Sequence, residues 1–268
     1  MRRVLFYVIL VALIGVILYS GYQIADYLIT SHKNESDFNE IAERVSTEAY
    51  EGETEAVTDE DGSVIEYLPV EAYIEDGSVL PEYRDLAEEN PDLVGWIRIG
   101  GTKVDYPVMQ TKKVPEYYLR KNFHKEYSLA GTPFMQADCV IGESDNLIIY
   151  GHHMKNGQMF GGFESYKKKD YYEDHKYVRF DTLTHRGVYK IFCVFKTTVY
   201  DEEGYKYYQF VGGYGDEKAY NEYIKNIRSL QLYDTGITAE FGDELLTLST
   251  CEYSAENGRL VLVCKKIW

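Results

Sequence analysis

Cysteine is scarce in this chain and irregularly spaced. The 268 residues contain four cysteines, Cys139, Cys193, Cys251 and Cys264. This number and spacing exclude a small disulfide-stapled domain and match no zinc-ligand motif, so we expect no bound metal. Cys193 and Cys264 lie inside the apolar runs YKIFCVF and RLVLVCKK. That context predicts small core residues rather than reactive thiols.

Positive charge is also in short supply. The chain has 28 Lys and Arg against 44 Asp and Glu, a formal net charge of −16. The excess is concentrated between Glu35 and Asp92, where 20 acidic residues stand against two basic ones, so the remainder is close to neutral. No basic patch with interleaved aromatic residues stands out, which argues against nucleic acid as a partner. The 27 tyrosines indicate a folded chain and favour strands.

The longest run without charge lies at the N-terminus. Arg2 and Arg3 precede the uncharged stretch from Val4 to Ala25, which is long enough to cross the ~30 Å core of a bilayer as a helix. It lacks the short apolar region and the small-residue cleavage site of a secretory signal peptide. We therefore predict a single membrane anchor at residues 1–30. The two arginines should stay in the cytoplasm, which places the rest of the chain outside the cell.

Residues 31–80 are acidic and, in their second half, poor in large apolar side chains. Such a segment cannot bury enough surface to offset the entropy lost on ordering. We expect a stalk outside the membrane that is helical near the bilayer, loose thereafter and extended by its own charge. A chain that begins near residue 80 should then keep the activity of the soluble domain.

Residues 81–268 have the pattern of a compact, mainly β domain. Pro81 favours a helix start, and Asn90-Pro91 ends that helix. Short β-like runs follow, separated by Gly, Asn and Asp as in a closed barrel or a sandwich; they are VGWIRIG, KVDYPVMQ, NLIIYGH, KYVRFDT, GVYKIFCVFKTTVY, DELLTLSTC and GRLVLVCKKIW. Two helical segments interrupt them, FGGFESYKKKDYYEDH and DEKAYNEYIKNIRSLQ. In the second, helical spacing predicts a packing face formed by Tyr220, Tyr223, Ile224, Ile227 and Leu230.

The last two strands predict a hairpin with reactive groups at its end. If they pair symmetrically about Ala255, Cys251 and Arg259 face each other. A nearby cation favours the thiolate, which attacks carbonyls, and a guanidinium fork is suited to a developing oxyanion. Upstream, LIIYGHHM places His152 just after a strand, where it can act as a general acid or base. A purely structural interpretation stays open here: an edge cysteine, a loop histidine and a solvated arginine.

The motifs themselves resemble one enzyme family. TLSTC followed by Arg259 is similar to the sortase signature TLxTC…R, YGHHM resembles the sortase histidine segment, and NPDLVGWIRIGGTKVDYPVMQ resembles the opening of the sortase barrel. The likeness runs from about Pro81 to Trp268. It implies a closed eight-stranded barrel with peripheral helices and a cysteine transpeptidase that needs no cofactor. Cys251 would form a thioester after the threonine of a C-terminal sorting signal, Arg259 would steady the oxyanion, and His152 would protonate the leaving amine.

The partners implied by the resemblance are secreted proteins that bear the sorting signal and an amine of a peptidoglycan precursor. The helical segment at 216–231 and the lead-in at 81–90 are typical of class B, which implies an Asn-Pro-x-Thr-x signal. Ser249 and Glu252 match positions that contact substrate in class B. Residues 131–146 depart from the family pattern, which leaves the groove residues there undefined. The alternatives are a pilin-polymerising sortase, a membrane-tethered cysteine peptidase that releases the free acid, and a non-catalytic cell-wall binding domain.

Overall fold

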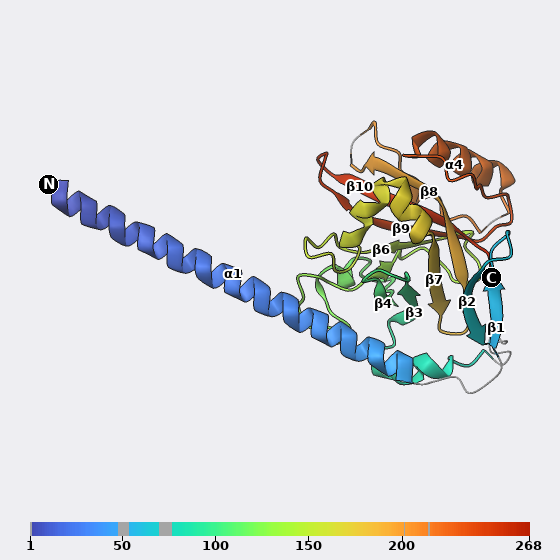
Figure 1. Cartoon of the computed structure of the whole chain (residues 1–268), viewed down its shortest axis with the longest axis horizontal. Coiled ribbons are helices and arrows are strands. Elements are labelled where there is room, and N and C mark those ends of the chain that lie inside the picture. The colour runs from blue at the N-terminus through green and yellow to red at the C-terminus, as the bar shows by residue number, and fades with distance from the viewer. Residues whose placement is uncertain (1, 48–53, 70–76, 201, 214) are drawn as a thin grey trace.

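The computed structural model describes residues 2–47, 54–69, 77–200, 202–213 and 215–268. Helix α1 (Arg2–Thr47) projects far beyond a compact β domain, which lies at the C-terminal end of this helix (Figure 1). Large apolar side chains are exposed along α1 from Val4 to Ile24. Within the described part of the chain, α1 is the one helix long and apolar enough to cross a membrane. Such a surface fits the predicted anchor, because bare apolar area of this length is costly in water.

Eight strands make up the domain: β3 (Leu93–Arg98), β4 (Asp105–Met109), β5 (Phe134–Met135), β6 (Asn146–Tyr150), β7 (Tyr177–Thr182), β8 (Val188–Thr198), β9 (Leu245–Glu252) and β10 (Gly258–Lys266). They form a closed barrel in the order β10-β8-β7-β3-β4-β5-β6-β9, and β9 pairs with β10 to complete the ring. Neighbours are antiparallel except for the parallel pairs β4–β5 and β6–β9. The expected mainly β class and eight-stranded sortase-type ring are confirmed.

Most of strand β8 does not alternate between apolar and polar residues. It is buried on both faces from Val188 to Phe195, because helix α4 (Glu217–Leu230) packs on its outer side. The Cys193 thiol donates to the Ile227 carbonyl across this contact, at 3.4 Å. Four members of the predicted packing face of α4 are buried, whereas Leu230, at the end of the helix, is exposed. The core placement of Cys193 and Cys264 is also confirmed.

Short helices fill the connections between strands. The predicted lead-in is present and ends at Asn90, and the first predicted helical segment divides into a 3₁₀ part and an α part. Two 3₁₀ turns and strand β5 were not expected, because two to four residues are too few for a periodic pattern. The bounds are η1 (Pro81–Tyr83), α2 (Arg84–Glu89), η2 (Tyr117–Arg120), η3 (Gly161–Lys167), α3 (Lys169–Asp174) and η4 (Tyr207–Gln209).

The C-terminal half of α1 belongs to the domain rather than to a free stalk. Asn34, Phe38, Ile41 and Val45 are buried at helical spacing along one side of the helix. The Phe38 ring packs edge-on against Tyr106, with 5.3 Å between ring centroids. The composition of the segment did not predict this buried stripe, because the acidic residues of the opposite face dominate it.

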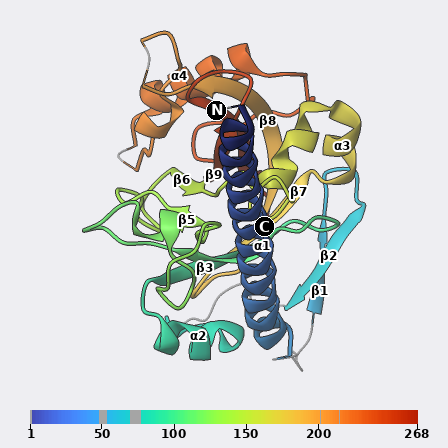
Figure 2. The same cartoon turned by 90° about the vertical axis from the view of Figure 1, so that its left-hand side faces the viewer.

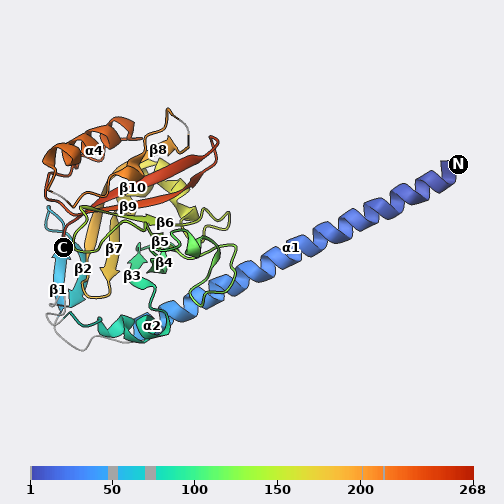
Figure 3. The same ribbon diagram turned by 180° about the vertical axis from the view of Figure 1, so that it is seen from behind.

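A hairpin also replaces part of the loose segment that the sequence predicts at 54–69. Strands β1 (Thr54–Thr58) and β2 (Val64–Pro69) pair with each other and lie beside the C-terminus (Figure 3). Val57 and Leu68 bury their side chains with Val188. Asp59 accepts hydrogen bonds from Lys190 at 2.6 Å and from Tyr177 at 2.6 Å. The expectation of a loose chain is therefore wrong for this hairpin, while residues 48–53 and 70–76 of the predicted stalk lie outside the described residues.

The buried stripe of α1 changes the expected result of truncation. A chain that begins near residue 80 should be less stable than one that begins at residue 31, by several kcal/mol. It loses five buried apolar side chains worth about 1.5–3 kcal/mol each, namely Phe38, Ile41, Val45, Val57 and Leu68. Phe38→Ala alone should cost about 3 kcal/mol in the free energy of unfolding. Denaturant unfolding followed by tryptophan fluorescence measures both, with the exposed Glu40→Ala as the matched control. Equal stability of Phe38→Ala and wild type would contradict the packing of α1 on the domain.

Candidate active site

The β9–β10 hairpin brings the predicted cysteine and arginine together. Cys251 and Arg259 are direct cross-strand partners, which confirms the register inferred from the sequence. A one-residue slip would move every side chain of β9 to the other face, and the buried leucines of the strand fix the register against it. Cys251 is partly exposed, whereas the preceding residues of the strand are buried. The hairpin therefore places a reachable thiol at the end of an otherwise inaccessible strand.

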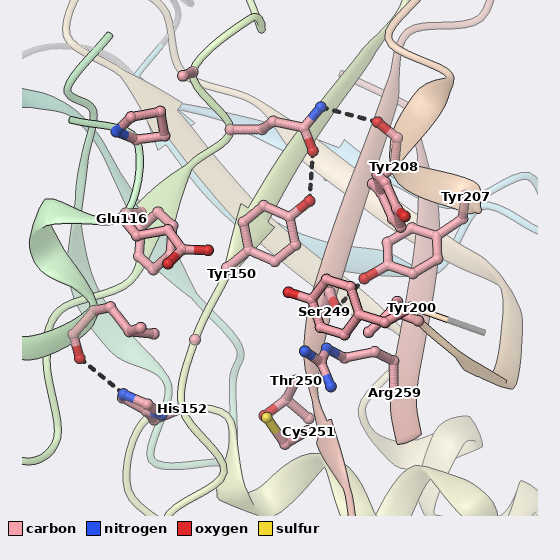
Figure 4. A pocket seen from close by; sticks show the side chains of 17 residues that line it. Glu116, Tyr150, His152, Tyr200, Tyr207, Tyr208, Ser249, Thr250, Cys251 and Arg259 are labelled. Carbon is pink, nitrogen blue, oxygen red and sulfur yellow. Dashed lines mark hydrogen bonds between the residues drawn. The ribbon is translucent and has the colours of Figure 1, made fainter. Parts of the chain in front are cut away.

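This thiol opens into a cavity of about 490 Å³. Ser249, Thr250 and Cys251 of β9 line it together with Arg259 of β10 and His152, which follows β6. Figure 4 shows His152 on one wall and Cys251 with Arg259 on the other. A cavity with a few convergent polar groups in a mainly apolar and aromatic lining is typical of a binding site for an extended organic substrate.

The loop after β6 positions His152. Strand β6 ends at Tyr150, and the Gly151 amide donates to the Ser249 carbonyl at 3.1 Å, which ties the loop to β9. A Cβ at Gly151 would lie 2.6 Å from the Phe160 ring, so only glycine fits before the histidine. The His152 Nε2 lies 2.8 Å from the Leu119 carbonyl oxygen. In this structure the imidazole is therefore hydrogen-bonded to Leu119 on its own side of the cavity and not to the Cys251 thiol.

The protonation of His152 follows from its burial. Burial lowers the pKa of His152 below the ordinary 6.5, and the nearby Arg120 adds to this, while the hydrogen bond to Leu119 opposes it. We expect an NMR titration of the His152 ring, assigned with a His152→Gln variant, to show a midpoint below 6.5. The imidazole is then neutral in most molecules at pH 7, and its protonated fraction falls further as pH rises. A midpoint above 6.5 would contradict this environment.

Arg259 is held by its own hairpin. Its Nη1 donates to the Gly258 carbonyl at 2.9 Å, and Asn257, with φ of 57°, turns the chain just before the strand. No described residue accepts a hydrogen bond from its Nε or Nη2. The Arg259 side chain lines the cavity beside Cys251 (Figure 4). The guanidinium can therefore bind an anionic oxygen next to the sulfur.

The other three cysteines differ from Cys251 in accessibility. Cys139, Cys193 and Cys264 are buried, and burial raises the pKa of each thiol, to about 11 for Cys139 and about 12 for Cys193. A buried thiol with a raised pKa is a poor nucleophile. Among the described residues, Cys251 is thus the one thiol suited to covalent chemistry.

The two residues predicted to bind substrate lie in different surroundings. Ser249 lines the cavity, but its hydroxyl is hydrogen-bonded to that of Tyr207 at 2.6 Å. Glu252 does not line the cavity. Its carboxylate, 4% exposed, accepts hydrogen bonds from Lys167 and Ser254 instead.

Sequence reasoning did not find the aromatic wall of the cavity. Tyr150, Tyr207 and Tyr208 line it, and Gln136 links two of them by donating to the Tyr208 carbonyl at 2.9 Å and accepting from the Tyr150 hydroxyl. Tyr150 could have been noticed, because it directly precedes the glycine and the histidine. The other two lie in an irregular connection between β8 and α4, where no spacing relates them to the hairpin.

A family model for the sortase domain matches residues 97–267. This chain belongs to the sortase family. It is 31% identical over 192 residues to sortase B of Staphylococcus aureus and 33% identical over 195 residues to sortase B of Listeria monocytogenes. These matches cover 70% and 71% of this chain, and 76% of each relative. The predicted family and its likeness to class B are confirmed, and the chain is a cysteine transpeptidase by family.

Solved structures agree with this assignment. A complex of Staphylococcus aureus sortase B with substrate superposes with a TM-score of 0.72 at 25% identity, over 89% of this chain and 98% of that one. Sortase B of Clostridium perfringens superposes with a TM-score of 0.63 at 32% identity, over 69% of this chain and 99% of that one. The eight-stranded ring of this sortase is thus the one that class B structures share.

Proposed function

We propose that this sortase cleaves a sorting signal of Asn-Pro-x-Thr-x type after the threonine and joins the new carboxyl end to an amine of a peptidoglycan precursor. The observation that carries the proposal is the cross-strand pairing of Cys251 with Arg259 at the cavity, with His152 on the facing wall. Class B likeness supports the choice of signal. The steps proposed below need no cofactor or metal.

In the first half-reaction the Cys251 thiolate attacks the carbonyl carbon of the threonine. A sulfur–carbon bond forms, and the carbonyl electron pair moves to oxygen, where the Arg259 guanidinium stabilises the charge. The carbon–nitrogen bond then breaks, the leaving amine takes a proton from His152, and a thioester remains on Cys251. The small protonated fraction of His152 at neutral pH is compatible with this role, because only that fraction supplies the proton.

In the second half-reaction the precursor amine attacks the thioester carbonyl. Neutral His152 accepts the proton of the incoming amine, the amide forms, and the carbon–sulfur bond breaks to restore the thiolate. Ser249 contributes to the cavity wall through its hydrogen bond to Tyr207.

We further propose that residues 1–30 anchor the protein in the cell membrane, with the N-terminus in the cytoplasm and the catalytic domain outside. The support is the exposed apolar surface of α1 and the position of Arg2 and Arg3 before it. The domain, predicted at 81–268, then includes the packed part of α1 from Asn34 to Val45 as well.

An amine-dependence assay tests the proposed function. Full-length protein in detergent should cleave an Asn-Pro-x-Thr-x peptide after threonine and, with an added amine such as triglycine, yield a product whose mass includes the amine. Mass spectrometry of the products decides between the possibilities. A free acid alone, unchanged by added amine, would indicate a peptidase, and cleavage of leucine-first signals only would contradict the class B signal.

A further inference from the structure

A network of charged and polar side chains supports the end of β9 from outside the cavity. It consists of His153, Glu164, Lys167 and Glu252, none of which lines the cavity around Cys251. Lys167, at the end of η3, pairs with Glu164 at 2.7 Å and with Glu252 of β9. The network therefore ties η3 to the hairpin that carries the thiol, and η3 contacts β9. In Figure 2, α3, the helix that follows η3, lies to the right of α1.

His153 connects this network to the cysteine itself. Its Nδ1 lies 2.8 Å from the Cys251 carbonyl oxygen and 3.8 Å from a Glu164 carboxylate oxygen. Since a carbonyl oxygen only accepts, Nδ1 carries the proton and donates it. The ring is 10% exposed, and the ring of Tyr253 packs on it at a tilt of 55°, with 4.9 Å between ring centroids. The main-chain carbonyl of Cys251 is thus held by a side chain that is itself mostly covered.

Glu252 fixes the next residue along the strand. Burial acts to raise its pKa, but the hydrogen bonds from Lys167 and Ser254 outweigh this and bring the pKa of Glu252 to about 2. Its second oxygen accepts from the Ser254 amide at 3.0 Å, which closes the turn of the hairpin. Both oxygens are therefore engaged within the protein, which leaves the side chain little capacity to bind substrate directly.

We propose that His153, Lys167 and Glu252 are positioning residues that act on the reaction through the main chain of Cys251. This inference rests on the proposed role of Cys251 as nucleophile. Thioester formation requires the sulfur to sit about 3–3.5 Å from the substrate carbonyl, and small displacements lower the rate steeply. Cys251 is the one residue of β9 that is only partly buried, so we infer that the network supplies the rigidity that the sulfur needs there.

Lys167→Met tests the proposal, because it removes both ion pairs while keeping the length of the side chain. We expect the rate of acyl-enzyme formation to fall on the order of 10-fold. KM for the peptide should stay close to wild type, whereas the melting temperature should fall, because Glu252 loses an ion pair; the rates are therefore compared well below the melting temperature of the variant. Lys167→Arg should restore most of the rate, since it keeps both pairs. Lys169→Met, an exposed lysine two residues away, is the matched control and should behave as wild type.

A second measurement separates this proposal from the proposed function. In Lys167→Met, hydrogen exchange at the amides of residues 251–254 should speed up, while exchange in β3 and β4 stays unchanged. Unchanged exchange at 251–254, or an unchanged acylation rate, would overturn the positioning network. A rate loss that only follows a lower melting temperature would also overturn it. A wild-type enzyme that forms no thioester would instead contradict the proposed function.

Discussion

Cys251→Ala should abolish both peptide cleavage and acyl-enzyme formation. The alanine variant has no group that can form the thioester, since the other three cysteines are buried away from the cavity and burial raises their pKa values. Intact-protein mass spectrometry after mixing with an Asn-Pro-x-Thr-x peptide measures this directly: wild type should gain the mass of the acyl fragment and the variant should gain none.

Cys193→Ala and Cys264→Ala are the matched controls for this experiment. Each removes a thiol from the core beside α4 or within β10 and should lower stability without changing the chemistry. Residual acylation in Cys251→Ala would show that a residue other than Cys251 acts as the nucleophile. Loss of acylation in a stably folded Cys193→Ala would contradict the purely structural role of that thiol.

His152→Ala should lower the rate by about 10²–10⁴-fold, the usual range for loss of a positioned general acid or base. The family histidine follows Tyr-Gly, which selects His152, and the structure places this ring at the cavity. His153→Ala should cost far less, on the order of 10-fold, because His153 contacts the Cys251 carbonyl and not the cavity. Parallel steady-state rates on the two variants measure the difference.

A larger loss in His153→Ala than in His152→Ala would reverse this assignment, and comparable losses would indicate a shared role. His153→Asn serves as a control for the hydrogen bond, since an amide N–H can still donate to the Cys251 carbonyl. It should therefore retain more activity than His153→Ala.

The sequence predicted the hairpin at the site well, because local rules determine it. Alternation along β9 and a short turn fix which residues oppose each other, so the pairing of Cys251 with Arg259 could be read without knowing the rest of the barrel. The position of His152 required the family motif in addition. Its distance from the hairpin in sequence is large, and only the parallel pairing of β6 with β9 brings the two together.

The surroundings of Glu252 could not be predicted in this way. Its position matches a substrate contact of class B, yet its environment depends on Lys167, 85 positions earlier in the chain. An ion pair across such a separation leaves no periodic signal. The same holds for the packing of Phe38 on Tyr106, where an acidic composition masks a narrow apolar stripe.

The continuous course of α1 limits how far the enzyme can reach. If residues 4–25 occupy the bilayer as proposed, Asn34, the first described residue of α1 that is buried, lies nine positions after Ala25. At 1.5 Å per residue this is a spacer of only about 14 Å, and a helix does not lengthen or coil as a flexible tether does. The catalytic domain would then work within a thin layer at the outer membrane surface. Sorting signals still held at the membrane fall within its range, and sites deeper in the wall do not.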